Sequence, residues 1–278
     1  MANKIIFTAD LHGRKEHYEE LFSLAAGTGA RTVIVGGDLT PHGSGLDGIL
    51  KQKKFLTDFL IPRLDSFSLE VPGVEVFLMM GNDDWRINMN VLRSDAGRSF
   101  RLLEAEESVL ADGTRLIGYP FVPITPFSLK DWEKWDKNLT GHENFFGLRS
   151  TEDGVEEVSL EERKHEKLET DLVRLSEEME LHDFIFVSHS PPHGTSLDLI
   201  GQESHVGSQS IREFLERNSP RLSLHGHIHE SPYVSKRYKE KLGGTLCVNP
   251  GQSFASKLHA VIFEAADPEG TMSHTIFG

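Results

Sequence analysis

Aspartate and histidine side chains follow the first predicted strand at the point where it ends. Asp10 and His12 come directly after the apolar run 3–9, and their i, i+2 spacing points both side chains the same way. Carboxylate oxygens and imidazole nitrogens are common ligands of transition metals. The pair therefore predicts part of a metal site, although a single strand end of this kind is weak evidence alone.

The next two apolar runs end in a similar way. The run 33–37 leads to Asp38, and the run that ends at Met80 leads through Gly81 to Asn82. Glycine allows a ligand or another backbone to approach closely, and a carboxylate such as that of Asp38 can bridge two cations. Open α/β sheets place their sites at the carboxyl ends of the strands, so we expect these side chains to converge at one edge.

Histidines end two further strands in the second half of the chain. His189 follows an apolar run before a Pro-Pro pair, and His227 and His229 stand two residues apart after another run. Any one of these histidines alone would fit a hydrogen-bonded structural role better. Strand-end clusters that recur in this order, each offering oxygen or imidazole ligands, predict a metal site instead.

The elements that must position these residues predict an α/β fold. Helical patterns at 15–27 and 48–65 alternate with the early β-rich runs, as in βαβ units. Asp112-Gly113 between apolar runs predicts a hairpin, and 267–270 predicts another turn, so the sheet should be mixed. The strands are expected at 3–9, 31–36, 74–80, 183–188, 221–225, 245–248 and 258–264.

One domain spanning 1–278 is expected, because a chain of this length can bury a large core and carries no Ser- or Gly-rich linker. Residues 119–158 are rich in Pro, Gly, aromatic and acidic residues and predict a lid-like insertion, with a short helix over 129–137. Ser159 and Glu162 form a possible capping box, which predicts that the next helix begins near residue 160.

The composition limits the partners. The net charge is −14, from 29 Lys and Arg against 43 Asp and Glu, so we expect neither duplex nucleic acid nor an anionic membrane as a partner. A metal-lined pocket can still attract one phosphate, which leaves a small phosphorylated substrate. No signal-peptide or membrane-spanning pattern stands out, and the lone Cys247 reads as a buried apolar residue. We expect a cytoplasmic protein, of an oligomeric state that the sequence leaves open.

The motifs together resemble the signature blocks of the calcineurin-like metallophosphoesterase superfamily, including its bacterial phosphodiesterase-like members. The matching positions are Asp10-x-His12, Gly37-Asp38, Gly81-Asn82, His189, Gly226-His227-x-His229 and, after them, Asn249-Pro-Gly251. The resemblance implies an α/β fold of four layers, an α-β-β-α sandwich in which two mixed β-sheets lie face to face between flanking helices.

The resemblance also implies a cofactor of two divalent or trivalent metal ions, drawn from Mn, Fe, Zn, Co or Ni. The first metal would be held by Asp10, His12, Asp38 and His229, and the second by Asp38, Asn82, His189 and His227. Because two carboxylates only partly neutralise two such ions, the site invites a bridging hydroxide and a phosphate oxygen. Two-metal sites of this kind generate the nucleophile and stabilise an in-line displacement, so the expected reaction is phosphoester hydrolysis.

Asp83 departs from the family pattern. Many members have a His after the Asn of the third block, where it helps to protonate the leaving oxygen. An aspartate is ionised at neutral pH and donates protons poorly, and its charge would repel a monoester dianion more than a diester monoanion. We therefore favour small phosphodiesters as substrates. His193 and His205, in loops beyond His189, are candidate proton donors, and each also fits a structural role in its loop.

Two other functions remain open from the sequence. One is a phosphomonoesterase or pyrophosphohydrolase that uses the same site. The other is a catalytically weak protein-interaction scaffold, because a retromer subunit resembles this fold and works mainly through protein binding. Retention of all the ligand positions argues against the scaffold, since buried histidines without a metal would incur desolvation costs.

Residues around the blocks receive lesser roles. Asp84 is expected to orient a neighbouring ligand through a hydrogen bond, and His225 is expected to be structural. A set of aromatic residues in or near the insertion could line a substrate pocket, but irregular spacing is more typical of packing, and we assign them no role: Phe121, Phe127, Trp132, Trp135, Phe145 and Phe146.

Overall fold

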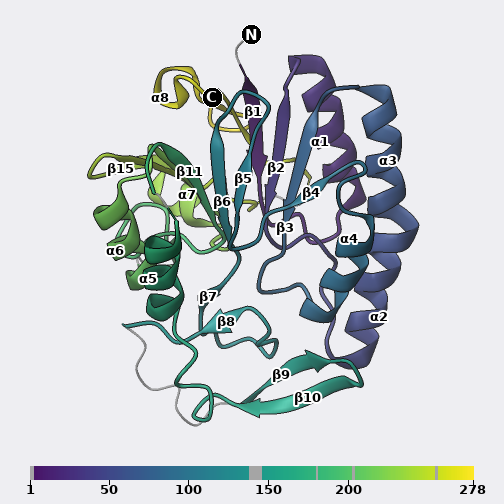
Figure 1. Ribbon diagram of the computed structural model, residues 1–278, viewed down its shortest axis with the longest axis vertical. Coiled ribbons are helices and arrows are strands. Elements are labelled where there is room, and N and C mark those ends of the chain that lie inside the picture. The colour runs from purple at the N-terminus through teal and green to yellow at the C-terminus, as the bar shows by residue number, and fades with distance from the viewer. Residues whose placement is uncertain (1–2, 138–145, 180, 202–203, 254–255) are drawn as a thin grey trace.

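Two six-stranded sheets pack face to face, with helices on their outer faces (Figure 1). The computed structural model describes residues 3–137, 146–179, 181–201, 204–253 and 256–278. The expected fold class, mixed α/β with two large mixed sheets flanked by helices, is confirmed.

The first sheet has the strand order β18-β17-β1-β2-β3-β4. Strands β1 to β4 are parallel, whereas β17 and β18 run antiparallel to their neighbours. The parallel part places the carboxyl ends of β1, β2 and β3 at one edge. The strands are β1 (Lys4–Thr8), β2 (Thr32–Gly36), β3 (Glu75–Met79), β4 (Arg101–Leu102), β17 (Val261–Glu264) and β18 (Ser273–His274).

The second sheet has the order β15-β16-β14-β11-β6-β5 and a similar plan. Its four central strands are parallel, and β15 and β5 are antiparallel edge strands. The turn of the β5–β6 hairpin lies at the predicted Asp112-Gly113. The strands are β5 (Glu107–Val109), β6 (Arg115–Tyr119), β11 (Phe184–Ser188), β14 (Leu222–Leu224), β15 (Lys239–Leu242) and β16 (Thr245–Val248).

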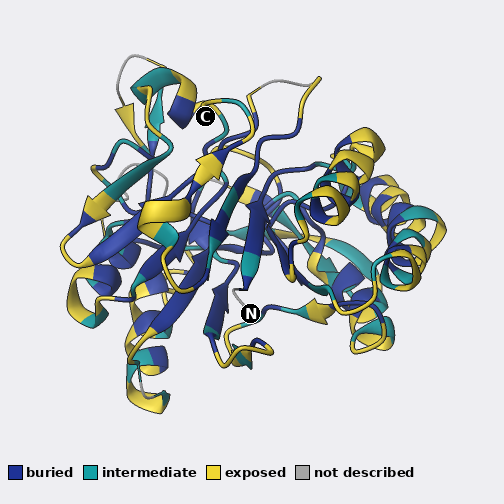
Figure 2. Cartoon of the chain, turned by 90° about the horizontal axis from the view of Figure 1, so that it is seen from above, coloured by how far each residue is buried: buried dark blue, intermediate teal, exposed yellow. Residues whose placement is uncertain are grey.

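Alternation along the strands divides the core into layers. In β1, Ile5 and Phe7 face the second sheet, whereas Ile6 faces the helices on the other side. On the second sheet, Phe184 and Phe186 of β11 pack outward against α5 and α6. Buried residues concentrate along the strands of both sheets, and the helices expose their outer faces (Figure 2).

Helices α1 to α4 lie on the outer side of the first sheet, and α5 and α6 lie on the outer side of the second (Figure 1). The predicted helix 48–65 is longer than expected: it runs from α2 through a π-helical turn, Leu56–Leu60, into α3. The π turn precedes Pro62, which has no N–H for a regular helical bond. The helices are α1 (Lys15–Thr28), α2 (Gly45–Phe55), α3 (Ile61–Glu70), α4 (Met89–Asp95), α5 (Leu168–Glu178), α6 (Gln209–Asn218), α7 (Ser231–Ser235) and α8 (Pro268–Thr271).

The insertion after β6 contains short strands, and the predicted helix over 129–137 is wrong. Residues in that stretch hydrogen-bond to distant parts of the chain: the carboxylate of Asp131 accepts from the backbone N–H groups of Arg86 and Ser150. These tertiary bonds override the weak helix propensity. The strands are β7 (Val122–Pro123), β8 (Glu133–Lys134), β9 (Phe146–Thr151) and β10 (Gly154–Ser159), and residues 138–145, including Phe145, lie outside the described part of the insertion.

The helix predicted to begin near residue 160 begins instead at Leu168, with Lys167 as its N-cap residue. Ser159 ends β10, so the predicted capping box with Glu162 does not form. The buried Arg163 explains the delay, because its guanidinium donates to the carbonyls of Lys130 and Glu133 and ties this stretch to the insertion.

Two smaller features complete the fold. A short pair, β12 (Leu199–Ile200) and β13 (Ser204–His205), lies between β11 and α6. Cys247 is buried, as expected. Within the described ranges, no helix combines the length and the apolar character that crossing a bilayer requires.

Candidate metal centre

The predicted ligands lie at the carboxyl ends of strands from both sheets, on backbone that is unusual for their residue types. Asp10, His12, Asp38 and His227 all have positive φ angles, of 60°, 45°, 53° and 66°. Such conformations cost about 1–3 kcal/mol each for residues other than glycine and occur preferentially at functional sites. Hydrogen bonds between the loops hold them: Asp10 N–H donates to Gly37 O, and His12 N–H donates to Asp38 O.

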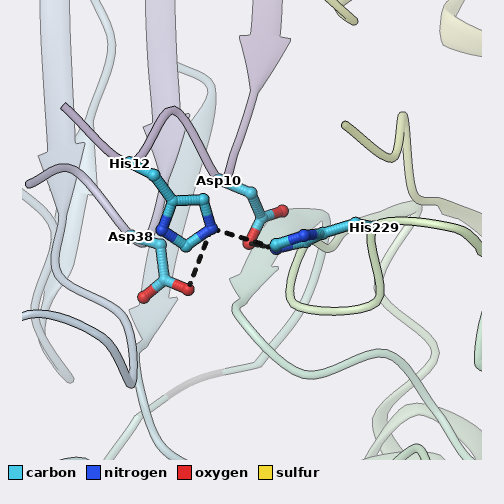
Figure 3. A group of neighbouring side chains, drawn as sticks. All are labelled: Asp10, His12, Asp38 and His229. Carbon is cyan, nitrogen blue, oxygen red and sulfur yellow. Dashed lines mark hydrogen bonds and ion pairs between the residues drawn. The ribbon is translucent and has the colours of Figure 1, made fainter. Parts of the chain in front are cut away.

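One group of side chains comprises Asp10, His12, Asp38 and His229, drawn in Figure 3. The Nε2 atoms of His12 and His229 lie 3.1 Å apart, and His12 Nε2 lies 3.8 Å from Asp38 Oδ2. His229 Nε2 is 3.3 Å from Asp10 Oδ1. The structure therefore brings together all the residues that the resemblance assigns to the first metal.

A second group lies beside the first and shares Asp38. His189 Nε2 is 3.3 Å from Asp38 Oδ2 and 3.2 Å from Asn82 Oδ1. The other ring nitrogen of His189 bonds to Gly36 O at 2.8 Å, which directs Nε2 toward the cluster. The ring of His227 lies with its centroid 5.4 Å from that of His189. These are the residues expected around the second metal.

Charges in the cluster fit cations. Burial lowers the pKa of His189, but the neighbouring Asp38 carboxylate raises it more, and the net pKa is about 9. His229 reaches a pKa of about 9 in the same way, with Asp10 opposing the effect of burial. Without a metal, the buried carboxylates are thus balanced by protons on two imidazoles. Metal cations would supply the same positive charge, and the facing nitrogen and oxygen atoms are the donors that they need.

Small residues and a buried carboxylate hold the ligands in place. A Cβ atom on Gly81 would lie 2.3 Å from Asp38 Oδ1, and one on Gly37 would lie 2.2 Å from His189 Nδ1, so only glycine fits at either position. The carboxylate of Asp84 accepts from the N–H groups of Leu39, Thr40 and Gly81, which joins the loops after β2 and β3. Asp84 thus holds the loops that carry the ligands through their backbone, rather than through the hydrogen bond to a neighbouring ligand that was expected.

His225 has a structural position, as expected. Its side chain is fully buried, with Nε2 2.8 Å from Ser223 Oγ and Nδ1 3.0 Å from Ser190 O. Burial lowers its pKa to about 4, so the ring is neutral at physiological pH.

Asp83 lies at the cluster and pairs with a histidine that the sequence analysis missed. Its backbone N–H donates to Asp38 Oδ1 at 2.8 Å, and its carboxylate Oδ2 lies 2.9 Å from His42 Nδ1. The His42 ring stacks on His12 with centroids 4.2 Å apart. The hydrogen bond to Asp83 raises the pKa of His42. The only signal in the sequence was that His42 follows Asp38 within the same loop.

His205 and His193 occupy different positions around a buried carboxylate. Asp198 is fully buried, and its Oδ1 lies 2.7 Å from His205 Nδ1, while its Oδ2 lies 3.6 Å from His193 Nδ1. His205 lines the cavity in front of the cluster, whereas His193 is not among the lining residues. The structure thus brings one of the two candidate proton donors to the site.

A cavity of about 870 Å³ opens in front of the cluster. Of the predicted metal ligands, Asp38, Asn82, His227 and His229 line it, as does Asp83. A loop of the insertion, residues 123–129, forms much of its other side and brings in Phe127, an aromatic residue to which the sequence gave no role. The remaining lining residues are His42, Gly43, Ser44, Ile200, His205, Val206, Gly207, Ile228 and Glu230.

Comparisons with known proteins agree with this geometry. A family model described as calcineurin-like phosphoesterase matches residues 3–231. An uncharacterized protein of Methanocaldococcus jannaschii is 25% identical over 251 residues, which make up 89% of this chain and 87% of that protein.

Solved structures share the fold at low identity. A protein of Thermus thermophilus aligns over 100% of both chains with a TM-score of 0.57 and 14% identity. A dimetal phosphatase from Danio rerio aligns over 94% of this chain and 92% of its own, with a TM-score of 0.50 and 12% identity. At these identities the structures establish the fold alone.

Proposed function

The chain belongs to the calcineurin-like phosphoesterase family, and we propose on that premise that it hydrolyses small phosphodiesters with a pair of bound metal ions. Metal-dependent phosphoester hydrolysis is the activity of the family. The observation that carries the two-metal proposal is the position of Asp38, whose Oδ2 lies 3.8 Å from His12 Nε2 on one side and 3.3 Å from His189 Nε2 on the other.

In this proposal Asp38 would be shared by two sets of metal ligands. Asp10, His12 and His229 complete the first set of ligands, and Asn82, His189 and His227 complete the second. Two such ions, when bound, activate a nucleophile at neutral pH and neutralise the charge that develops during in-line displacement. A pair of ions is also what the name of the dimetal phosphatase with the same fold states for that protein.

The chain's own groups then decide which phosphoester fits. Asp83 lines the cavity together with Asp38 and Asn82, so its carboxylate, although paired with His42, adds negative charge near the place where the phosphate must approach. A monoester dianion meets more repulsion there than a diester monoanion. This difference favours phosphodiesters over the phosphomonoesters and pyrophosphates of the alternative function.

A proton for the leaving oxygen requires another group, and we assign that task to His205. His205 lines the cavity, and because the buried Asp198 binds its Nδ1, Nε2 is the ring nitrogen that can serve the substrate. A carboxylate that fixes one ring nitrogen orients the other for proton transfer. His193, held by the opposite oxygen of Asp198 outside the cavity lining, is assigned no role in the reaction.

Hydrolysis by metal-stripped and refilled protein tests the proposal. The protein is refilled with Mn, Fe, Zn, Co, Ni or Mg in turn and given p-nitrophenyl phosphate and methyl p-nitrophenyl phosphate, which share one leaving group. We expect activity only with metal, about two metal ions per chain at full activity, and a higher kcat/KM for the diester. Preference for the monoester would establish the alternative phosphatase, and full activity with one bound ion would contradict the bridging role of Asp38.

A further inference from the structure

Within the described part of the chain, the cavity has no Lys or Arg side chain to receive a second anionic group. Of the described residues that line it, none is Lys or Arg, whereas Asp83 and Glu230 add carboxylates beyond the ligand Asp38. The residues outside the described ranges contain no Lys or Arg in their sequence either. A substrate with a second anionic group away from the reacting phosphate would therefore meet no permanently charged cation in the cavity.

The side of the cavity that lies away from the metal cluster is largely apolar. Residues 123–129, hereafter the wall loop, contribute Pro123, Ile124, Pro126, Phe127 and Leu129 to the lining. The Phe127 side chain is 59% exposed although it is large and aromatic. Ile200, Val206 and Ile228 continue the apolar lining.

Buried charges hold the wall loop in its shape. Lys130 and Glu133 are each about 1% exposed, and Lys130 Nζ lies 2.7 Å from Glu133 Oε2. Lys130 Nζ also donates to the carbonyls of Thr125 and Phe127, and Glu133 accepts from the Thr125 N–H. Buried ion pairs contribute little net stability to a fold. We therefore assign the Lys130–Glu133 pair a positioning role: it fixes the backbone of the wall loop and so the position of Phe127.

The size and chemistry of the space define an occupant. About 870 Å³ lies within the range of ~300–1,000 Å³ that encloses drug-sized ligands, so a phosphate alone would leave most of the cavity empty. The lining includes the ring-bearing residues Phe127, His42 and His205 and the hydroxyl-bearing residues Ser44 and Ser128. Aromatic faces beside a few polar groups suit a flat ring with polar edges better than a long alkyl chain.

We propose that the wall loop forms a subsite for an uncharged aromatic group, of about the size of a nucleobase, that is one ester group of the phosphodiester. The proposal rests on the diesterase function above and names the class of substrate. Phe127 packs against the ring and is the specificity-determining residue. The lack of Lys and Arg excludes substrates that carry a second phosphate or carboxylate on that group.

Four chromogenic diesters test the subsite. Methyl, n-hexyl, phenyl and 4-carboxyphenyl p-nitrophenyl phosphates release the same phenolate, and each kcat/KM is divided by the rate constant of spontaneous hydrolysis. We expect the phenyl ester to exceed the methyl and hexyl esters by about tenfold, as aromatic packing of 1–2 kcal/mol provides. The 4-carboxyphenyl ester should fall below the phenyl ester by a similar factor.

Two variants locate the effect. Phe127→Ala should remove most of the advantage of the phenyl ester over the methyl ester. Phe146→Ala is the matched control, because Phe146 is a similarly exposed phenylalanine of the insertion, 62% exposed, that does not line the cavity. Ser128→Lys should place a cation in the wall loop and raise the ratio of 4-carboxyphenyl to phenyl ester several-fold.

The outcomes separate the subsite from the underlying function. A hexyl ester that equals the phenyl ester, or an aromatic preference that survives Phe127→Ala, would overturn the aromatic subsite. Equal turnover of the phenyl and 4-carboxyphenyl esters would overturn its exclusion of charge. If none of the diesters is hydrolysed in a metal-dependent way, the diesterase function itself fails.

Discussion

On one side of the cavity, the candidate ligands follow the carboxyl ends of parallel strands. On the other side, the wall loop is part of an insertion whose strands β7 and β8 have two residues each. The candidate metal ligands are held in place by the two large sheets and by hydrogen bonds between neighbouring loops. The wall loop is held in place by the buried ion pair of Lys130 and Glu133. The reacting group and the recognised group are therefore positioned by separate structures, and changes on one side should alter different kinetic constants from changes on the other.

The largest effect is expected from Asp38→Asn. The substitution keeps the shape of the side chain but removes the charge that we place between two cations, so kcat/KM should fall by about 10³-fold or more and bound metal should decrease. Metal content by elemental analysis and diester turnover check it. Asp58→Asn, at an exposed carboxylate of the π-helical turn, is the control and should leave both unchanged.

Metal affinity, as distinct from turnover, should depend steeply on pH. His189 and His229 each have a pKa raised to about 9, burial being outweighed by Asp38 and Asp10 respectively, so below that pH both rings hold protons that a metal must displace. Affinity should rise between pH 6 and 9 by up to about 100-fold per unit, since two protons are released, and then level off. Chelator competition at each pH measures it, and a flat profile would contradict this protonation.

His205→Asn should reduce the hydrolysis of diesters with poor leaving groups by about 100-fold and that of p-nitrophenyl diesters much less, because only a poor leaving oxygen needs a proton in the transition state. His42→Asn and His193→Asn are measured beside it. A larger loss with His42→Asn would move the proton donor to the imidazole paired with Asp83. Loss of the same size with all leaving groups would indicate a binding role.

Two buried aspartates allow the two sides of the cavity to be compared directly. Asp84 accepts backbone N–H bonds that join the loops after β2 and β3. Asp131 accepts one backbone N–H bond from Arg86, outside the insertion, and one from Ser150 of β9, within it. Asp84→Asn should lower metal affinity and kcat about tenfold, as loss of ligand support does in other metal sites. Asp131→Asn should spare metal affinity and raise KM. If both variants changed metal affinity and KM to the same extent, the distinction between the two sides of the cavity would be lost.

The metal side could be predicted from the sequence because its signals are local. A glycine or an apolar strand directly precedes Asp10, Asp38 and Asn82, and the parallel pairing of β1, β2 and β3 then brings them together. The positive φ angles of Asp10, His12 and Asp38 could not be predicted, since they depend on hydrogen bonds between loops that are distant in sequence.

The wall and its partners could not be predicted for the same reason. The pattern over 129–137 predicted a helix, yet Lys130 and Glu133 turn inward to form a buried pair, which no periodicity indicates. His42 was overlooked because its partner Asp83 comes from a different loop, after β3. The proposed single domain and the closing of the insertion over the cavity stay predictions.

The smallest effect on activity should follow from Lys130→Met. This substitution alters the support of the wall loop and leaves the metal ligands unchanged. The single substitution leaves Glu133 buried without its partner and should lower the free energy of unfolding by about 3–5 kcal/mol. The double variant Lys130→Met/Glu133→Met replaces the pair with apolar side chains and should recover most of that stability. The double variant does not restore the hydrogen bonds that Lys130 Nζ donates to the carbonyls of Thr125 and Phe127. KM for the phenyl diester should therefore stay several-fold raised at an unchanged kcat in both variants, and a double variant with normal KM would show that packing alone positions the wall loop.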